Sequence, residues 1–199
     1  MKNITQLGIN VFLRSEGNVA FKCAWNDAQY EGKCRDCPNT NPSCAQKWIH
    51  VTPKECWERH IFEKWEFGVG ENRHINQARI GKVVVFTTKK PFSNHKTVFG
   101  VARLKDIEKE RQYPAYPPFP ASWSDIVHID PELTVAIPSS ININFEEFYE
   151  KRWSQGLFRY LSDDIVRKIL LRIKSEMQAA KYSPQELHKL QQLISSFSF

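Results

Sequence analysis

The chain has 199 residues, of which 41% are hydrophobic and 25% are charged, with a formal net charge of +6. This composition excludes a disordered or membrane-spanning polypeptide and is typical of a globular protein with its own hydrophobic core. The N-terminus lacks the apolar run of a signal peptide, so we expect a cytoplasmic protein. The excess of basic residues favours a polyanionic partner but does not by itself establish one.

The N-terminal third combines short strands with a polar loop. Residues 9–25 alternate apolar and polar side chains around a turn, which predicts a hairpin or two short strands. Residues 27–43 are polar and rich in turn-forming residues, so we expect a loop there. A short helix is expected over 52–64, where Thr52 can cap the first turn and Pro53 can occupy the first helical position.

The centre of the chain is rich in β-branched and aromatic residues. Three of its segments are predicted to be strands, at 64–69, 82–88 and 97–104. Gly81 opens the second strand, and residues 89–95 are expected to form an exposed hairpin tip before the third.

Prolines interrupt the β-rich region. Residues 113–121 contain four prolines and three aromatic residues, which predicts a stiff loop packed on its own domain. A ligand segment for an SH3-like partner is the alternative interpretation. Two further strands are expected at 124–129 and 133–138, separated by a turn at Asp130–Pro131, so that the strands suffice to close a barrel.

The C-terminal part has helical periodicity. Helical segments are expected at 145–149, at 163–173 and from Ser183 onward, where a proline stands at the first helical position. The middle segment has an apolar face, made by Ile165, Ile169, Leu170 and Ile173, and a basic face, made by Arg167, Lys168, Arg172 and Lys174. We expect the apolar face to dock on the barrel or on a partner chain, and not on a membrane.

Five cysteines stand between positions 23 and 56. In a reducing compartment such a group favours metal ligation over disulfides. Four of them have the spacing C-x10-C-x2-C-x6-C, and we predict that they hold a structural zinc ion: Cys23, Cys34, Cys37 and Cys44. The fifth, Cys56, is expected to be a buried free thiol, with replacement of one of the four ligands as the alternative.

A second metal remains open for the same cysteines. Residues 34–38 read Cys-Arg-Asp-Cys-Pro and, with Cys44, resemble the iron-sulfur loop of endonuclease III and MutY-type glycosylases. The resemblance implies a [4Fe-4S] cluster in place of zinc. Four protein ligands close the coordination shell of either metal, so we expect a structural role.

Residues 65–106 resemble the PUA-like superfamily, in particular its EVE and YTH branches. The likeness lies in the aromatic segment 65–72, the helix-like segment 72–78 and the glycine-led strands 80–88 and 99–104, and Trp123 resembles a late tryptophan of EVE domains. Lys82 and Thr87 depart from the family pattern, which often has an acidic residue and a tyrosine there.

The resemblance implies an α+β fold with a PUA-like (EVE/YTH-type) β-barrel, a cysteine-metal loop and C-terminal helices. The expected organisation is an N-terminal part over 1–63 that packs on the barrel, a barrel core over 64–144 and a helical extension over 145–199. Such barrels bind modified bases. The implied function is recognition of a modified base by base flipping, as a specificity part of a modification-dependent restriction system in which a separate nuclease or motor subunit can take part.

A base removed from its stack needs aromatic faces around it and polar groups at its edge. The residues expected to form this base pocket are Trp65, Phe67, Asn72, Asn76, Thr87, Thr88, Trp123 and Trp25. The residues expected to contact the nucleic-acid backbone are Arg73, Arg79, Lys89, Lys90 and Lys96. Tryptophans in a small barrel also suit a hydrophobic core, and His74 and His95 are expected at the surface.

DNA is favoured over RNA as the partner, and modified RNA is the nearest alternative because related barrels bind it. An iron-sulfur nucleic-acid enzyme, such as a glycosylase or nuclease, is an alternative from another class. The sequence shows no catalytic constellation, so no enzymatic activity is predicted.

Overall fold

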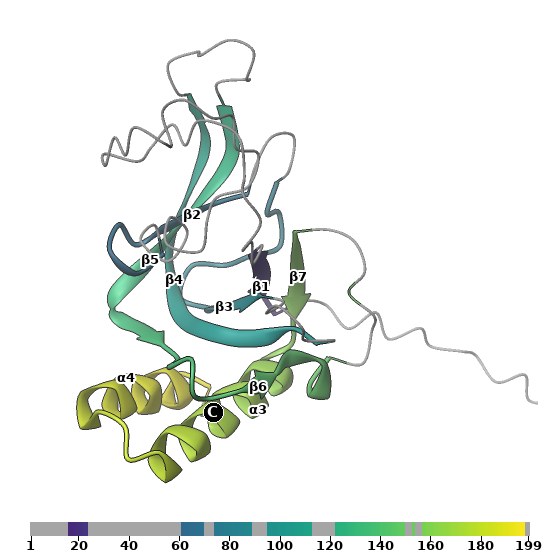
Figure 1. Ribbon diagram of the computed structural model, residues 1–199. Coiled ribbons are helices and arrows are strands. Elements are labelled where there is room, and N and C mark those ends of the chain that lie inside the picture. Colours follow the sequence, from purple (N-terminus) through teal and green to yellow (C-terminus); the bar gives the residue numbers. More distant parts are fainter. Residues whose placement is uncertain are drawn as a thin grey trace, which may run out of the picture.

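The computed structural model describes residues 16–23, 61–69, 74–88, 95–112, 122–149, 153 and 157–197. Within these residues the chain is an α+β protein with a curled, mixed sheet of seven strands and two C-terminal helices (Figure 1). The strands are β1 (Asn18–Cys23), β2 (Glu66–Gly68), β3 (Val83–Thr88), β4 (Thr97–Gln112), β5 (Ser122–Ala136), β6 (Ile143–Asn144) and β7 (Phe158–Leu161). A 3-10 turn, η1 (Phe145–Glu147), precedes β7, and the helices are α3 (Asp163–Ala179) and α4 (Pro184–Ser195).

The strand order is β2-β5-β4-β3-β1-β7, and β6 pairs with β4 outside this path. β1 runs parallel to β3, with Val19 opposite Val84, and antiparallel to β7. The three central segments that were expected to be strands, 64–69, 82–88 and 97–104, contain β2, β3 and β4, and all three belong to this one sheet. β1 does not form a local hairpin in the described residues, and β7 was not predicted.

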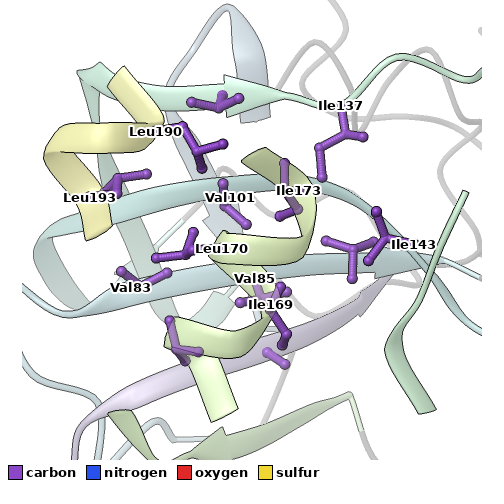
Figure 2. Close-up of a cluster of buried hydrophobic side chains, with 14 of the residues drawn as sticks. Val83, Val85, Val101, Ile137, Ile143, Ile169, Leu170, Ile173, Leu190 and Leu193 are labelled. Atoms are coloured by element: carbon purple, nitrogen blue, oxygen red, sulfur yellow. The ribbon is translucent and has the colours of Figure 1, made fainter. Parts of the chain in front are cut away.

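The two helices cover one face of the sheet. Ser162 caps α3 by accepting a hydrogen bond from the Ile165 amide, at 3.3 Å. The apolar sides of the two helices meet buried residues of β3, β4 and β5. The residues of this first core include Val83, Val85, Val101, Ile169, Leu170, Ile173, Leu190 and Leu193 (Figure 2). The expected docking of the apolar helix face on the sheet is confirmed.

The opposite face of the sheet carries a second apolar core, rich in aromatic residues. Its buried members include Phe21, Val84, Phe86, Ala102, Leu104, Val127 and Ile129. A close approach at Gly100 shapes it, because a Cβ atom there would lie 2.8 Å from the Phe62 ring. The ring occupies the space that a side chain would need, so only glycine suits this position.

A buried amide fixes the position of β1. The Asn18 Oδ1 atom accepts a hydrogen bond from the Val83 amide at 2.9 Å, and its Nδ2 atom donates to Asp163 Oδ1 at 2.7 Å. The Lys82 ammonium also reaches the Asp163 carboxylate, at 2.8 Å. We call these four residues the Asn18 junction. It joins β1 to the start of β3 and to the first turn of α3.

The predicted turn at Asp130–Pro131 is wrong, because β5 continues through it as one strand. The ladder with β4 is interrupted there: Ala102 pairs with Thr134 and Leu104 with Ile129, so four residues of β5 stand against Arg103 alone. This bulge tolerates Pro131, since a residue outside the ladder needs no amide hydrogen.

In the part of the chain that the structure describes, neither helix combines the length and apolarity needed to span a membrane.

Replacing Asn18 by alanine should lower the free energy of unfolding by about 1–3 kcal/mol, because it leaves the buried Val83 amide without its acceptor and removes the hydrogen bond to Asp163. Urea titration followed by circular dichroism measures the change. Gln185→Ala, at an exposed position of α4, is the control and should stay within about 0.5 kcal/mol of the parent chain. Equal stability of the two variants would contradict the role given to the Asn18 junction.

Candidate functional site

The long strands β4 and β5 continue beyond β1, β3 and β7 as an arm, and β2 pairs with β5 at the base of this arm (Figure 1). We define the arm as residues 105–112 of β4 and 122–128 of β5, which pair antiparallel as far as Gln112 and Ser122. Lys109 stands directly opposite Asp125, and Phe67 of β2 stands opposite Val127. Because alternate residues of a strand share a face, Asp125, Val127 and Phe67 lie on the face that bears the second core.

The Asp125 side chain is fully buried at the base of the arm, where it joins three segments. Its Oδ2 atom accepts hydrogen bonds from the Lys109 ammonium and the Ile75 amide, both at 2.6 Å. Its Oδ1 atom lies 3.2 Å from His74 Nδ1. We call these four residues the Asp125 cluster. It holds the segment that begins at His74 against the arm.

Two opposing effects set the charge of this carboxyl. Burial by itself would raise the pKa of Asp125, but hydrogen bonds from Lys109, the Ile75 amide and His74, together with the Lys109 charge, hold its pKa below the usual value. Asp125 is therefore a carboxylate at neutral pH. A carboxylate only accepts hydrogen bonds, so the neighbouring groups must donate to it.

Two of the predicted pocket aromatics pack against the second core and remain partly exposed. The Phe67 ring centroid lies 4.7 Å from that of Phe21 and 5.8 Å from that of Phe86. Trp65 has a φ of 58°, in the left-handed region that tryptophan rarely adopts, and its carbonyl accepts a hydrogen bond from the Ile129 amide at 2.9 Å. The structure thus brings Trp65 and Phe67 to the same core.

The other described pocket candidates differ in exposure. Thr87 is buried and its hydroxyl donates to the Phe21 carbonyl at 3.0 Å, so this hydroxyl already has a structural partner. The hydroxyl of Thr88 is also buried and has no partner among the described residues. Asn76 is exposed.

Two of the predicted backbone-contacting residues are described. The Arg79 stem lies across Gly17, whose φ is 95°, and the Arg79 amide donates to the Gly17 carbonyl at 3.0 Å. Lys96 forms an ion pair with Glu146 at 3.0 Å, and its ammonium lies 5.8 Å from the Trp153 ring centroid. Its charge is therefore compensated within the fold.

The remaining candidates lie outside the described residues and stay predictions: Trp25, Asn72, Arg73, Lys89, Lys90, Cys34, Cys37 and Cys44. Trp123 belongs to β5, where it pairs with Arg111, but its side chain is outside the described part.

The sequence interpretation missed Asp125 and Lys109. One signal was available, because Asp125 shares the alternation of Val127 and Ile129 and so is an acidic residue in an inward register. The helix expected over 72–78 is absent from the described residues 74–80. In this segment the Ile75 amide donates to the Asp125 carboxylate at 2.6 Å and the Gln77 amide to the Tyr160 hydroxyl at 3.2 Å.

One predicted zinc ligand, Cys23, is described. Its thiol lies at the end of β1, is 4% exposed and belongs to the second core. Burial raises the pKa of this thiol well above its usual value. The four-cysteine site itself stays a prediction, since its other members lie outside the described residues.

The cysteine prediction is tested by metal analysis of the purified chain. One zinc per chain, with loss of the metal in Cys34→Ser, is the expected result. A brown preparation containing iron and sulfide would identify the cluster instead. Cys23→Ala is the informative comparison. If Cys23 is a ligand, the variant should lose the metal, whereas if Cys23 is only a core residue, the variant should keep the metal and be less stable. A metal-free parent chain would contradict both the zinc assignment and the iron-sulfur assignment.

Asp125→Asn should change the dependence of stability on pH. A native-state pKa below the unfolded-state value stabilises the fold at every pH above the unfolded-state pKa, and this stabilisation is lost as the pH falls through the native-state pKa. At neutral pH the variant should therefore be less stable by about 1.5–3 kcal/mol, and the difference should shrink in acid. Urea titrations at a series of pH values measure it.

The exposed Asp164 of α3 provides the control for this experiment. Asp164→Asn should follow the parent chain within about 0.5 kcal/mol. A difference between the parent chain and Asp125→Asn that stayed constant with pH would show that folding does not lower the pKa of Asp125.

No protein-family model matches the chain, and no curated protein matches it. Among solved structures it is similar to a crystal structure of a ZmASCH mutant protein from Zymomonas mobilis. That alignment has 8% sequence identity and a TM-score of 0.46, and it covers 80% of this chain and 98% of the other. No family is assigned on this similarity.

Proposed function

We propose that this chain is a nucleic-acid-binding module that recognises a modified base by base flipping, with the flipped base stacked on aromatic side chains. DNA is favoured over RNA as the nucleic acid. The proposed fold family is the PUA-like superfamily, in its EVE and YTH branches. The observation that carries the proposal is the partly exposed pair Trp65 and Phe67 on the sheet face opposite the helices.

The backbone of Trp65 supports a ligand-binding role. A left-handed conformation costs a residue other than glycine about 1–2 kcal/mol. Here the hydrogen bond from the Ile129 amide and the packing of the indole hold it in place. Strained residues of this kind are concentrated at ligand sites, where a fixed side chain is needed before the ligand arrives.

The division between the sheet faces also supports the proposal. Among the described residues, α3 and α4 cover one face of the sheet, and the partly exposed rings lie on the opposite face, which also carries the ionised Asp125. Rings bind a base by stacking, and polar groups beside them distinguish its edge. In a modification-dependent restriction system such a module selects the site, and another subunit cuts or translocates the DNA.

The proposal is tested by measuring binding to methylated, hydroxymethylated and unmodified oligonucleotides, each as DNA and as RNA. Trp65→Ala should weaken binding to the preferred oligonucleotide about 5- to 150-fold, since stacking on one aromatic residue contributes about 1–3 kcal/mol. Tyr182→Ala removes a partly buried ring from the helix side of the sheet and should bind like the parent chain.

If the chain preferred a modified RNA, the proposed pocket would stand, but the partner would be RNA and not DNA. Equal affinity of the parent chain for every oligonucleotide would reject modified-base recognition. A loss of binding in Tyr182→Ala as large as that in Trp65→Ala would place the binding surface elsewhere.

A further inference from the structure

The histidine of the Asp125 cluster differs from a surface histidine. Its Nδ1 atom is bonded to a fully buried carboxylate, while 44% of the side chain remains exposed. Buried aspartates that contact one ring nitrogen fix both the orientation of an imidazole and the position of its proton. The rest of the ring then faces outward in a defined direction.

The chemistry of Asp125 determines which nitrogen carries the proton. The carboxylate accepts from Lys109 and from the Ile75 amide and has no proton to donate. His74 must therefore donate through Nδ1–H. In the neutral imidazole the Nε2 atom is then a hydrogen-bond acceptor, and it has no protein partner in the described part of the chain.

The position of this acceptor relates it to the aromatic pair. Asp125 shares its sheet face with Phe67, and the Val69 amide, which follows β2, donates to the Asp125 carbonyl at 3.0 Å. Ile75, next to His74, is 2% exposed and belongs to the core against which Trp65 and Phe67 pack. The imidazole is thus anchored at the edge of the same core as the two rings.

We propose that His74, positioned by Asp125, reads the base by accepting a hydrogen bond at Nε2 from the exocyclic amino group of cytosine or adenine. This inference rests on the proposed function and adds a specificity-determining residue to it. Asp125 acts through His74 and is a positioning residue.

A base edge suits this acceptor better than a phosphate does. A phosphodiester offers only acceptor oxygens, so it cannot donate a hydrogen bond to Nε2. An amino group supplies the proton that Nε2 lacks. A binding site built to accept that proton disfavours a base without it, because the acceptor then loses its water and gains no partner.

His128 provides a matched control on the same arm. It stands opposite Glu66 and Asp106 on the other face of the sheet, and its Nε2 atom lies 3.0 Å from Glu108. It is a histidine that contacts a carboxylate like His74, but it lies on the opposite face of the sheet from Phe67.

The test compares the preferred oligonucleotide with one whose target base lacks the amino group, pyrimidin-2-one for cytosine or purine for adenine. The parent chain should bind the amino-bearing base about five- to tenfold more tightly. His74→Ala should bind both oligonucleotides equally, and His128→Ala should discriminate like the parent chain. Thermal unfolding of each variant verifies that it is folded.

Nitrogen NMR of the His74 ring in the parent chain tests whether Asp125 fixes the tautomer of His74. The ring should be protonated at Nδ1 and unprotonated at Nε2, and Asp125→Asn should increase the share of the other tautomer and reduce discrimination. Binding of both bases with equal affinity by the parent chain, retained discrimination in His74→Ala, or an Nε2–H tautomer would each overturn the inference. If Trp65→Ala still weakened binding, the proposed function would stand, whereas failure of the parent chain to bind any oligonucleotide would reject both.

Discussion

The buried amide of Asn18 is the contact on which the arrangement of the sheet depends. β1 lies between β3 and β7, and its residues Val19, Ala20 and Phe21 are fully buried. A strand covered on both faces gains apolar burial from every residue but needs a fixed register, because a slip by one residue exchanges its faces. The Asn18 junction supplies that register and places α3 over the sheet at the same time.

The two faces of the sheet use the same strands for different purposes. On the helix side, aliphatic side chains from β3 and α3 form a core of the usual kind. The other side carries aromatic rings and the ionised Asp125. Hydrogen bonds from three donors compensate the cost of burying this charge. A rigid helical layer behind the sheet therefore supports the face on which we place the ligand.

The sequence was most informative where one periodicity dominated. α3 was predicted from its apolar face, α4 from Ser183 and the proline at its first helical position, and β3 from its run of β-branched residues. β7 was missed because its position depends on pairing with β1, far away in the chain. The role of Asp125 could not be predicted either, because it depends on contacts with Lys109 and His74 that form only in the folded chain.

The bulge in β5 has a consequence for how one strand serves two cores. Before it, the odd-numbered Val127 and Ile129 face the aromatic side, and after it the odd-numbered Leu133 and Val135 face the helices. The irregularity thus reverses the parity of the strand. Without this reversal, the strand that carries Asp125 into the candidate site would turn its later apolar side chains away from α3 and α4.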